Sequence, residues 1–430
     1  MNIPRVDLPR IVVVGCGFAG LKFVQTINSK LYQVVLLDKN NYHTFQPLMY
    51  QVATSGLEPD SITYPIRKIF KGKKRLHFRK TTVERIDTEQ KQVHTTIGAI
   101  DYDHLVVALG ATNNFFGNKD VEQYAVPMKS LVESLQLRSM ILQNFEEALN
   151  TSNIEEQNRL MNFVIVGGGA TGVELAGALA ELKSHVLPND YPDLDIRRME
   201  IHLVEGSQSV LSAMSDNASK KSYAFLKKSG VNIWLSTRVQ GYDGETVTTN
   251  KENFESKAVI WTAGVKARNL EGLDTGGSEN GRILVDDRGK AVAHDDVYVI
   301  GDMAEMRSEE TPRGHAMLAS VAGQQGAWLA KNFNYRSKGK ETKPFTYKDK
   351  GTMATIGRNK AVVDLKNFKF SGYFAWLTWM FVHLMLLVDY RNRLIVFMNW
   401  AWRYIKYDRG SRLIIREYKR KEKKEPEQPS

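Results

Sequence analysis

Thiols are almost absent from this sequence. Cys16 is the one cysteine among 430 residues, so a disulfide framework is excluded. The same count excludes enzymes that relay electrons through a pair of cysteines, and we interpret Cys16 as a small residue in a loop. The nine histidines show no metal-ligand spacing, and no metal site is predicted.

Long apolar runs are also scarce. Residues 1–10 lack the apolar core of a signal peptide, so we expect a protein that faces the cytoplasm. An uncharged stretch at residues 370–388 has 19 residues, and at about 1.5 Å per residue it would barely cross a hydrocarbon core about 30 Å thick. A shorter apolar stretch follows at residues 394–405. We expect this hairpin to lie on a membrane surface rather than to span the bilayer.

Positive charge is concentrated near the C-terminus. The formal net charge is +11, and residues 389–425 hold 12 Lys/Arg and 5 Asp/Glu, a net +7. A basic excess can mark nucleic-acid binding, but these basic residues flank apolar helices instead of lining a groove. We therefore predict contact with anionic lipid headgroups and no nucleic acid, and we expect residues 419–430 to be a disordered tail. The interfacial residues are expected to be Trp376, Trp379, Trp400, Trp402, Arg391, Arg393, Arg403 and Lys406.

Two glycine-rich turns each follow a short apolar strand. They read GCGFAG at residues 15–20, after IVVV, and GGGATG at residues 167–172, after FVIV. In such a turn the first glycine permits the tight bend, the second lets the backbone approach a pyrophosphate, and the third allows close packing of the helix. The chain is therefore predicted to bind two dinucleotides, in two α/β Rossmann-like domains with parallel sheets.

An acidic residue follows each turn at the end of the next strand. Asp38 lies 18 residues after Gly20, and Glu205 lies 33 residues after Gly172. Each carboxylate is placed to accept hydrogen bonds from ribose hydroxyls, although a solvated strand end is the alternative. We attribute the longer second spacing to a loop at residues 184–198. Glu205 would repel a 2′-phosphate, which favours NADH over NADPH.

A late apolar strand indicates which glycine turn binds which nucleotide. Residues 297–302 read VYVIGD, an apolar strand that ends in Gly301-Asp302. In flavoproteins that bind two dinucleotides, such an aspartate meets the ribityl and phosphate end of FAD. We therefore assign FAD to the first glycine turn and NADH to the second.

Taken in order, these motifs resemble those of the type II NADH:quinone oxidoreductases, single-subunit flavoproteins on the membrane surface of respiratory chains. The resemblance covers nearly the whole chain. It rests on both glycine turns, on DKNNYHTFQPL at residues 38–48, GATGVELAG at 169–177, TAG at 262–264, Gly301-Asp302, FVHL at 381–384 and RNR at 391–393. It implies FAD as cofactor, and NADH and a quinone as substrates.

The resemblance also implies roles for the residues that match these motifs. For FAD they are Gly15, Gly17, Phe18, Ala19, Gly20, Asp38, Lys39, Gln46, Ala108, Gly110, Gly301, Asp302 and Ala319, and for NADH they are Gly167, Gly169, Ala170, Thr171, Gly172, Glu205, Ala263 and Gly264. Glu174 is implied in hydride or proton handling. The alternative for Glu174 is a carboxylate that the helix dipole favours near a helix N-terminus.

The quinone side of the family carries the pattern AQxAxQ, and this chain reads ASVAGQ at residues 319–324. The implied quinone residues are Gln46, Ala319, Ser320, Ala322 and Gln324, of which Ser320 departs from the pattern. Gln324 is the second implied catalytic residue, because its amide could donate to a quinone carbonyl. The alternative is a small-residue helix face packed on the FAD domain. Asp389-Tyr390 also departs from the family, in which a glycine and an aromatic residue precede RNR.

We predict an enzyme that transfers a hydride from NADH to FAD and then two electrons to a membrane quinone, without proton pumping. Residues 1–116 and 282–343 are expected to form the FAD domain and residues 117–281 the NADH domain. Residues 344–430 are expected to serve membrane attachment and homodimerisation. Two alternatives stay open: a soluble NADH-dependent flavin reductase that serves a protein acceptor, and a non-catalytic membrane redox sensor.

Overall fold

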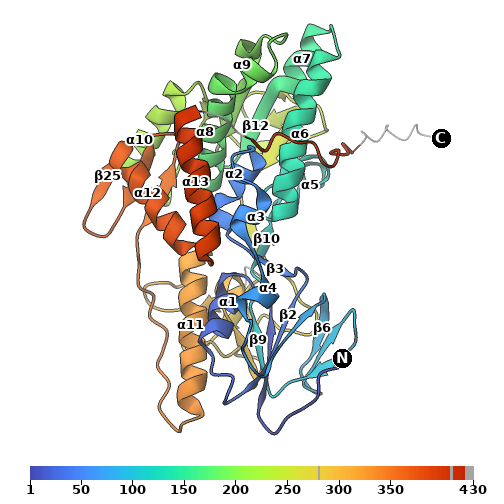
Figure 1. Ribbon diagram of the computed structural model, residues 1–430, viewed down its shortest axis with the longest axis vertical. Helices are drawn as coiled ribbons and strands as arrows, with labels where there is room; N and C mark the ends of the chain where they lie inside the picture. The colour runs from blue at the N-terminus through green and yellow to red at the C-terminus, as the bar shows by residue number, and fades with distance from the viewer. Residues whose placement is uncertain (279–280, 407–409, 422–430) are drawn as a thin grey trace, which may run out of the picture. The chain divides into compact units, whose positions relative to one another are not determined.

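The structure is a computed structural model that describes residues 1–278, 281–406 and 410–421 (Figure 1). The chain divides into two compact units. Unit 1 comprises residues 1–44, 63–112 and 265–349, and unit 2 comprises residues 45–62, 113–264 and 350–430. Of the tail expected at residues 419–430, residues 422–430 lie outside the described residues.

Unit 1 is built on a parallel five-stranded sheet with the order β21-β9-β1-β2-β5. The strands are β1 (Arg10–Val14), β2 (Gln33–Asp38), β5 (Leu76–Lys80), β9 (His104–Val107) and β21 (Val297–Val299). Val12, Val13, Val34 and Val35 have no exposed surface, as expected of strands covered on both faces. The late strand β21 pairs with β9, so the apolar residues 297–299 complete the first sheet as predicted.

Two helices of unit 1, α1 (Phe18–Thr26) and α11 (Ala319–Arg336), pack closely against each other. Gly326 permits the approach, because a Cβ there would lie 2.1 Å from the carbonyl oxygen of Ala19. The other elements of unit 1 are β3 (Tyr42–Thr44), β4 (Thr63–Pro65), α4 (Ile66–Ile69), β6 (Val83–Asp87), β7 (Gln92–Thr95), β8 (Ile100–Asp101), β20 (Ile283–Val285), η3 (Gly301–Met303) and β22 (Ala304–Met306). The strands β10 (Ala111–Asn113) and β19 (Val265–Ala267) form a two-stranded sheet where the chain passes between the units.

Unit 2 repeats the parallel architecture with the order β11-β18-β12-β13-β14. The strands are β11 (Val126–Pro127), β12 (Asn162–Val166), β13 (Glu200–Val204), β14 (Asn232–Trp234) and β18 (Ala258–Trp261). Its longest helix is α6 (Leu131–Leu149), which Ser130 and Glu133 begin with a capping box. The glycine turn leads into α8 (Ala170–His185). The expected loop at residues 184–198 instead contains the end of α8, α9 (Leu187–Asp190) and the short helix η2 (Ile196–Arg198).

Residues 45–62 belong to unit 2 although they follow the first glycine motif in sequence. They form η1 (Gln46–Leu48), α2 (Met49–Ala53) and α3 (Pro59–Ile62), and α2 packs against α6 and α8. The remaining elements of this unit before residue 265 are α5 (Lys119–Tyr124), α7 (Ile154–Met161), α10 (Asp216–Lys228), β15 (Val239–Tyr242), β16 (Thr246–Thr249) and β17 (Phe254–Glu255).

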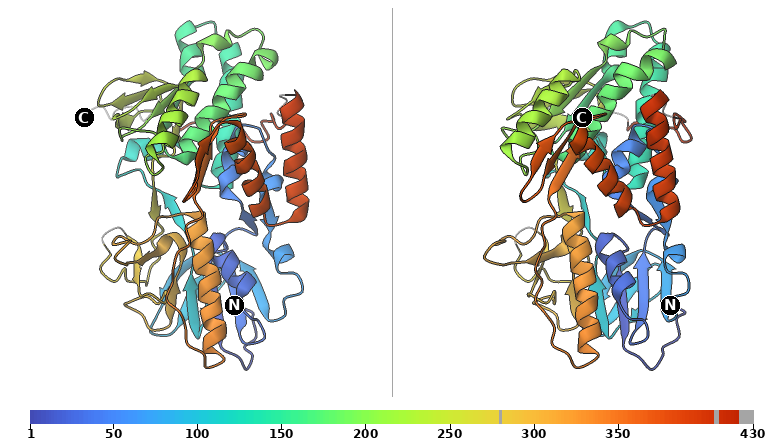
Figure 2. Two further views of the ribbon diagram at one scale, coloured as in Figure 1. Left: turned by 90° about the vertical axis from the view of Figure 1, so that its left-hand side faces the viewer. Right: turned by 60° about the vertical axis from the view of Figure 1, so that its left-hand side comes forward.

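The C-terminal part of unit 2 consists of a small antiparallel sheet and two helices (Figure 2). The sheet contains β23 (Thr352–Thr355), β24 (Ala361–Asp364) and β25 (Lys369–Ser371), and the helices are α12 (Tyr373–Leu386) and α13 (Tyr390–Lys406). β23 packs on α8, and α12 packs on all three strands. None of the helices in the described ranges is a candidate for a membrane-spanning segment.

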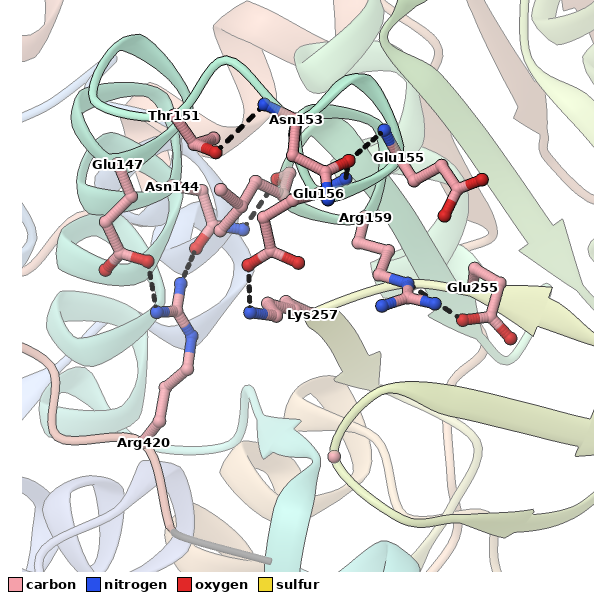
Figure 3. A network of polar contacts seen from close by, with 12 residues as sticks. Asn144, Glu147, Thr151, Asn153, Glu155, Glu156, Arg159, Glu255, Lys257 and Arg420 are labelled. Atoms are coloured by element: carbon pink, nitrogen blue, oxygen red, sulfur yellow. Dashed lines mark hydrogen bonds and ion pairs between the residues drawn. The ribbon is translucent and has the colours of Figure 1, made fainter.

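After α13, residues 410–421 run along unit 2 as a segment that we call the C-terminal strap. Arg412 pairs with Asp190 at 2.7 Å, and the backbone N–H of Tyr418 donates to the Gln143 side chain at 2.5 Å. Arg420 reaches Glu147 and Asn144 on α6 (Figure 3). These contacts hold the C-terminal strap against unit 2, which also contains the second glycine turn.

Candidate active site

The first glycine turn has no room for side chains at two of its three glycines. Gly15 has a φ of +99°, and a Cβ there would lie 2.4 Å from the carbonyl oxygen of Ala108. A Cβ at Gly20 would lie 1.9 Å from the carbonyl oxygen of Gly15, whereas one at Gly17 would meet no described atom within 4 Å. In the described chain no side chain caps α1, which begins at Phe18. The turn therefore offers open backbone and a helix N-terminus, the arrangement that binds a pyrophosphate.

The second turn repeats this geometry in unit 2. Gly167 has a φ of +111°, and a Cβ there would lie 2.6 Å from Cα of Ala263. A Cβ at Gly172 would lie 1.9 Å from the carbonyl oxygen of Gly167, and one at Gly169 would meet nothing within 4 Å in the described part of the chain. α8 begins at the next residue, again uncapped by any described side chain. Both turns thus fit a dinucleotide for the same steric reasons.

Both strand-end carboxylates turn back to their glycine turns. Asp38 accepts hydrogen bonds from the backbone N–H groups of Cys16 at 2.6 Å and Asn40 at 2.7 Å. Glu205 accepts from the N–H groups of Gly168 at 2.5 Å and Ser207 at 2.7 Å. Burial raises the pKa of Asp38, and the two N–H groups oppose that rise. Each carboxylate is therefore hydrogen-bonded to the backbone of its own glycine turn.

Cys16 lies inside the first turn and is buried. Burial, helped by the nearby Asp38, raises the pKa of the thiol well above its ordinary value. A thiol held in its protonated form is a poor nucleophile. This agrees with the interpretation of Cys16 as a small packing residue.

The Gly301-Asp302 motif begins η3 in unit 1. Gly301 has a φ of +75°, and a Cβ there would lie 3.2 Å from the Cβ of Ala19 and 3.5 Å from that of Ala322. Its N–H donates to the Gln325 side chain at 2.7 Å. Gln325 is 1% exposed. The glutamine of α11 that supports this motif is therefore Gln325 and not Gln324. The sequence offered two adjacent glutamines, and only the helix register separates them.

The predicted quinone residues of α11 have partners within unit 1. The Gln324 amide donates to the carbonyl oxygen of Lys348 at 2.9 Å and accepts from its N–H at 3.0 Å. Ser320 hydrogen-bonds the Tyr347 hydroxyl at 2.9 Å. Ala319 is exposed and Ala322 is buried beside Gly301. Gln46, the other predicted quinone residue, lies in η1 of unit 2.

Glu174 lies on α8 and is 8% exposed. Its carboxylate accepts from the backbone N–H of Thr355 at 3.3 Å. Burial raises the pKa of Glu174 to about 8, although Thr355 and the indole of Trp379 oppose the rise. A carboxylate stabilised mainly by the helix dipole would show the opposite shift. Burial thus favours the neutral form of the Glu174 carboxyl group.

The surroundings of Glu174 come from distant parts of the sequence. Thr355 is on β23, Trp379 is on α12 and Tyr50 is on α2. Burial raises the pKa of Tyr50, and the nearby Glu174 charge adds to the rise. Nothing in the spacing of residues near 174 indicates these neighbours. Sequence reasoning missed them, and it missed Gln325 as well.

Known proteins match both the two-nucleotide region and the C-terminal part. The pyridine nucleotide-disulphide oxidoreductase family matches residues 9–326, and the NDH2 C-terminal domain matches residues 350–406. The type II NADH:quinone oxidoreductase Ndh of Mycobacterium tuberculosis is 32% identical over 425 residues, covering 94% of this chain and 90% of that protein. NdhA of the same organism, also described as a type II NADH:quinone oxidoreductase, is 31% identical over 424 residues, covering 94% and 89%.

A solved structure shares the fold over almost the full length. The structure of NDH2 from Plasmodium falciparum in complex with NADH superposes with a TM-score of 0.87 at 21% sequence identity, covering 95% of this chain and 100% of that one. The two glycine turns, the NDH2 C-terminal domain and the sequence identity lead to one conclusion: the chain belongs to the type II NADH:quinone oxidoreductase family.

Proposed function

We propose that this NADH:quinone oxidoreductase holds its FAD cofactor on unit 1 and its substrate NADH on unit 2, each on its own glycine turn. The observation that carries the proposal is the repeated turn, in which Gly17 and Gly169 leave the backbone open beside an uncapped helix within the described chain. Bound FAD supplies the redox chemistry, since it accepts a hydride and returns electrons to a quinone.

On unit 1 the chain's own residues bind and orient the flavin nucleotide. Gly15, Gly17 and Gly20 give the pyrophosphate access to the backbone, and Asp38 receives the ribose hydroxyls. Gly301 and Asp302, which Gln325 supports through the Gly301 N–H, receive the ribityl and phosphate end. The further FAD residues that we propose on unit 1 are Phe18, Ala19, Lys39, Ala108, Gly110 and Ala319, and Gln46 of unit 2 is proposed as well.

On unit 2 the second turn positions NADH. Glu205 is already oriented by Gly168 and Ser207, so its carboxylate favours a ribose 2′-hydroxyl and repels a 2′-phosphate. Ala263 and Gly264, which follow β18 beside Gly167, lie next to the nucleotide. The further NADH residues are Gly169, Ala170, Thr171 and Gly172. Holding the nicotinamide in place supplies much of the acceleration of hydride transfer.

Glu174 holds the proton that quinone reduction needs. With a pKa of about 8, the carboxyl group is mostly protonated at neutral pH and can act as a general acid. The quinone contacts Gln46, Ala319, Ser320, Ala322 and Gln324, and Gln324 exchanges its bonds to the Lys348 backbone for a quinone carbonyl.

The C-terminal helices attach the enzyme to a membrane surface. On α12, Phe374, Leu377, Phe381 and Met385 are exposed and follow one helical face, while Trp379 is buried on the other. α13 likewise exposes apolar residues, at Leu394, Phe397, Met398, Trp402 and Ile405. Exposed apolar faces mark interaction sites, and the exposed Arg391 and Lys406 suit anionic headgroups. The expectation that Trp379, Trp400 and Arg403 lie at the interface is wrong, because both indoles are buried and Arg403 bonds the Gln51 side chain inside unit 2.

We further propose that the enzyme attaches peripherally to the cytoplasmic side of the cell inner membrane, forms a homodimer through its C-terminal part and does not pump protons. The exposed apolar faces favour this enzyme over a soluble flavin reductase. Steady-state quinone reduction separates it from a non-catalytic redox sensor.

The purified protein tests the whole proposal. It should carry non-covalent FAD, oxidise NADH and reduce a soluble short-chain quinone. A preparation that binds FAD and NADH but never reduces the quinone would refute the assigned activity.

A further inference from the structure

A cavity of about 90 Å³ lies wholly within unit 2, beside Glu174. One wall is a single face of α8, which carries Glu174, Glu181 and His185. Residues spaced by seven and eleven positions follow the same side of a helix. Along this face Glu174 is buried, Glu181 is half-buried and His185 is exposed. The three ionisable groups therefore form a row from the interior to solvent.

The facing wall is hydrogen-bonded and polar. On α2 the Gln51 amide donates to the Tyr50 hydroxyl oxygen at 2.8 Å, and its carbonyl oxygen accepts from the Trp400 indole at 2.9 Å and from Arg403 at 3.3 Å. Because Tyr50 receives the Gln51 N–H, its own O–H can be donated elsewhere. Thr54 lies one turn further along this wall.

This cavity is large enough and polar enough to hold water. One water needs roughly 10–15 Å³ of such volume and two to four polar partners. The cavity offers room for several waters, and Glu174, Tyr50, Thr54 and Glu181 supply partners. The other side of the cavity is apolar and is formed by Trp376, Trp379, Met380 and Tyr404. Water would therefore follow the polar row.

The reaction of the enzyme needs such a path. NADH delivers two electrons and one hydrogen as hydride, whereas a quinone takes two electrons and two protons to become a quinol. The balance is NADH + H⁺ + quinone → NAD⁺ + quinol, so each turnover takes one proton from solvent. If Glu174 donates that proton, its buried carboxylate must be protonated again before the next turnover.

We propose that the cavity is a water-filled proton inlet, in which Glu181 passes protons from the His185 end through water and Tyr50 to Glu174. The proposal rests on the proposed role of Glu174 as proton donor. It assigns relay roles to Glu181 and Tyr50, and it places proton entry on the α8 surface of unit 2.

Charges around the inlet support this direction of flow. Burial raises the pKa of Glu174 to about 8 and, with the nearby Glu174 charge, raises the pKa of Tyr50 well above its ordinary value. A carboxylate left behind after proton donation is therefore driven to take up a new proton. Arg403, whose pKa burial lowers, interacts with Glu181 and Tyr50, and the backbone N–H of Arg358 donates to Glu181. Arg403 and Arg358 are the cations that face the row, and His185 is the ionisable group at its rim.

The test separates electron transfer from proton uptake in Glu181→Gln. Enzyme reduced anaerobically with NADH is mixed with either a soluble short-chain quinone or ferricyanide, and the flavin absorbance is followed. Ferricyanide takes up electrons and no protons. We expect quinone reoxidation to slow by about tenfold or more, with a larger solvent isotope effect, while reoxidation by ferricyanide and reduction by NADH keep their wild-type rates. Millimolar imidazole buffer should restore part of the quinone rate.

A second variant covers the case in which Glu181→Gln disturbs folding, because Glu181 also interacts with the half-buried Arg403. Ala178→Leu puts a larger side chain into the cavity and should slow the quinone step alone, without rescue by imidazole. Glu155→Gln, on the exposed first turn of α7, is the matched control and should behave as wild type. Wild-type quinone rates in both cavity variants would overturn the inlet. Failure of NADH to reduce the flavin in the wild type would instead refute the proposed function.

Discussion

At the scale of single residues, three carboxylates show how environment divides chemical roles. Asp38 and Glu205 each accept two backbone N–H groups of their own nucleotide turns. Glu174 accepts one, from Thr355, and is otherwise buried among α2, β23 and α12. The first two are therefore fixed by their glycine turns, which supports the proposed contacts to ribose, whereas the raised pKa of the buried Glu174 supports its proposed role as proton donor.

The burial of Glu174 predicts a pH-dependent cost to stability. Its pKa rises from 4.5 to about 8 on folding, so the unfolded chain releases a proton that the folded chain keeps between those pH values. The stability that the protonated Glu174 contributes is thus fully present below pH 4.5 and is lost as the pH rises through about 8. Glu174→Gln removes this loss. We expect its advantage over wild type in free energy of unfolding, obtained from thermal melts, to grow from pH 5 to pH 9 and to reach on the order of 2–4 kcal/mol.

Thermal melts of the two proteins across this pH range check the expectation. Glu155→Gln changes an exposed carboxylate of the same unit and should show no such trend. A constant difference between Glu174→Gln and wild type would mean that the folded carboxyl titrates near its ordinary pKa.

Glu205 predicts the choice of nicotinamide nucleotide. Glu205→Ser removes the charge that repels a 2′-phosphate, and we expect the ratio of kcat/KM for NADPH to that for NADH to rise by roughly 10- to 100-fold. Glu200→Ser at the exposed start of the same strand should leave the ratio unchanged. Equal ratios in wild type and Glu205→Ser would exclude the carboxylate as the discriminating group.

The sequence predicted residues in local motifs better than residues brought together by packing. Gly15, Gly167 and Asp38 follow from the motif and its spacing, because a turn and its strand are neighbours in the chain, whereas Glu205 follows from its place at the end of the next apolar strand. Tyr50 could not be predicted as a neighbour of Glu174, because that contact depends on how α2 packs against α8.

At the scale of elements, α12 and α13 are apolar on two faces. Ala375, Trp379 and His383 pack inward from α12, while Phe374 and Phe381 stay 74% and 65% exposed. α12 has 14 residues, a length of about 21 Å against a hydrocarbon core of about 30 Å. The uncharged run of 19 residues is shortened because Gly372, at a φ of +89°, precedes the helix, which ends at Leu386.

The exposed face of α12 predicts how firmly the enzyme binds lipid. We expect the double variant Phe374→Ser/Phe381→Ser to bind anionic vesicles roughly tenfold or more weakly, since each phenylalanine contributes about 1.5–3 kcal/mol when buried. Vesicle sedimentation measures the change. Ile97→Ser, exposed in unit 1, is the control and should sediment as wild type. Unaltered binding by the double variant would place the lipid contact elsewhere.

At the scale of the whole molecule, one nucleotide-binding architecture occurs twice in a chain with a single thiol. The parallel sheets and glycine turns of both units were predictable, because period, turn chemistry and strand burial are local properties. The grouping of residues 45–62 and 350–430 with the second turn was not. This grouping depends on how α2, β23 and α12 pack around α8. Such packing between distant segments produces no sequence pattern within any one of them.

The central claim is that electrons pass from NADH to a bound flavin and from there to a quinone, with no pair of cysteines involved. Anaerobic stopped-flow absorbance of the purified Cys16→Ala enzyme tests it most directly. NADH should bleach the flavin band at the wild-type rate, and a soluble quinone should then restore it. Flavin that stays bleached after the quinone is added, in this variant and in wild type, would contradict the account.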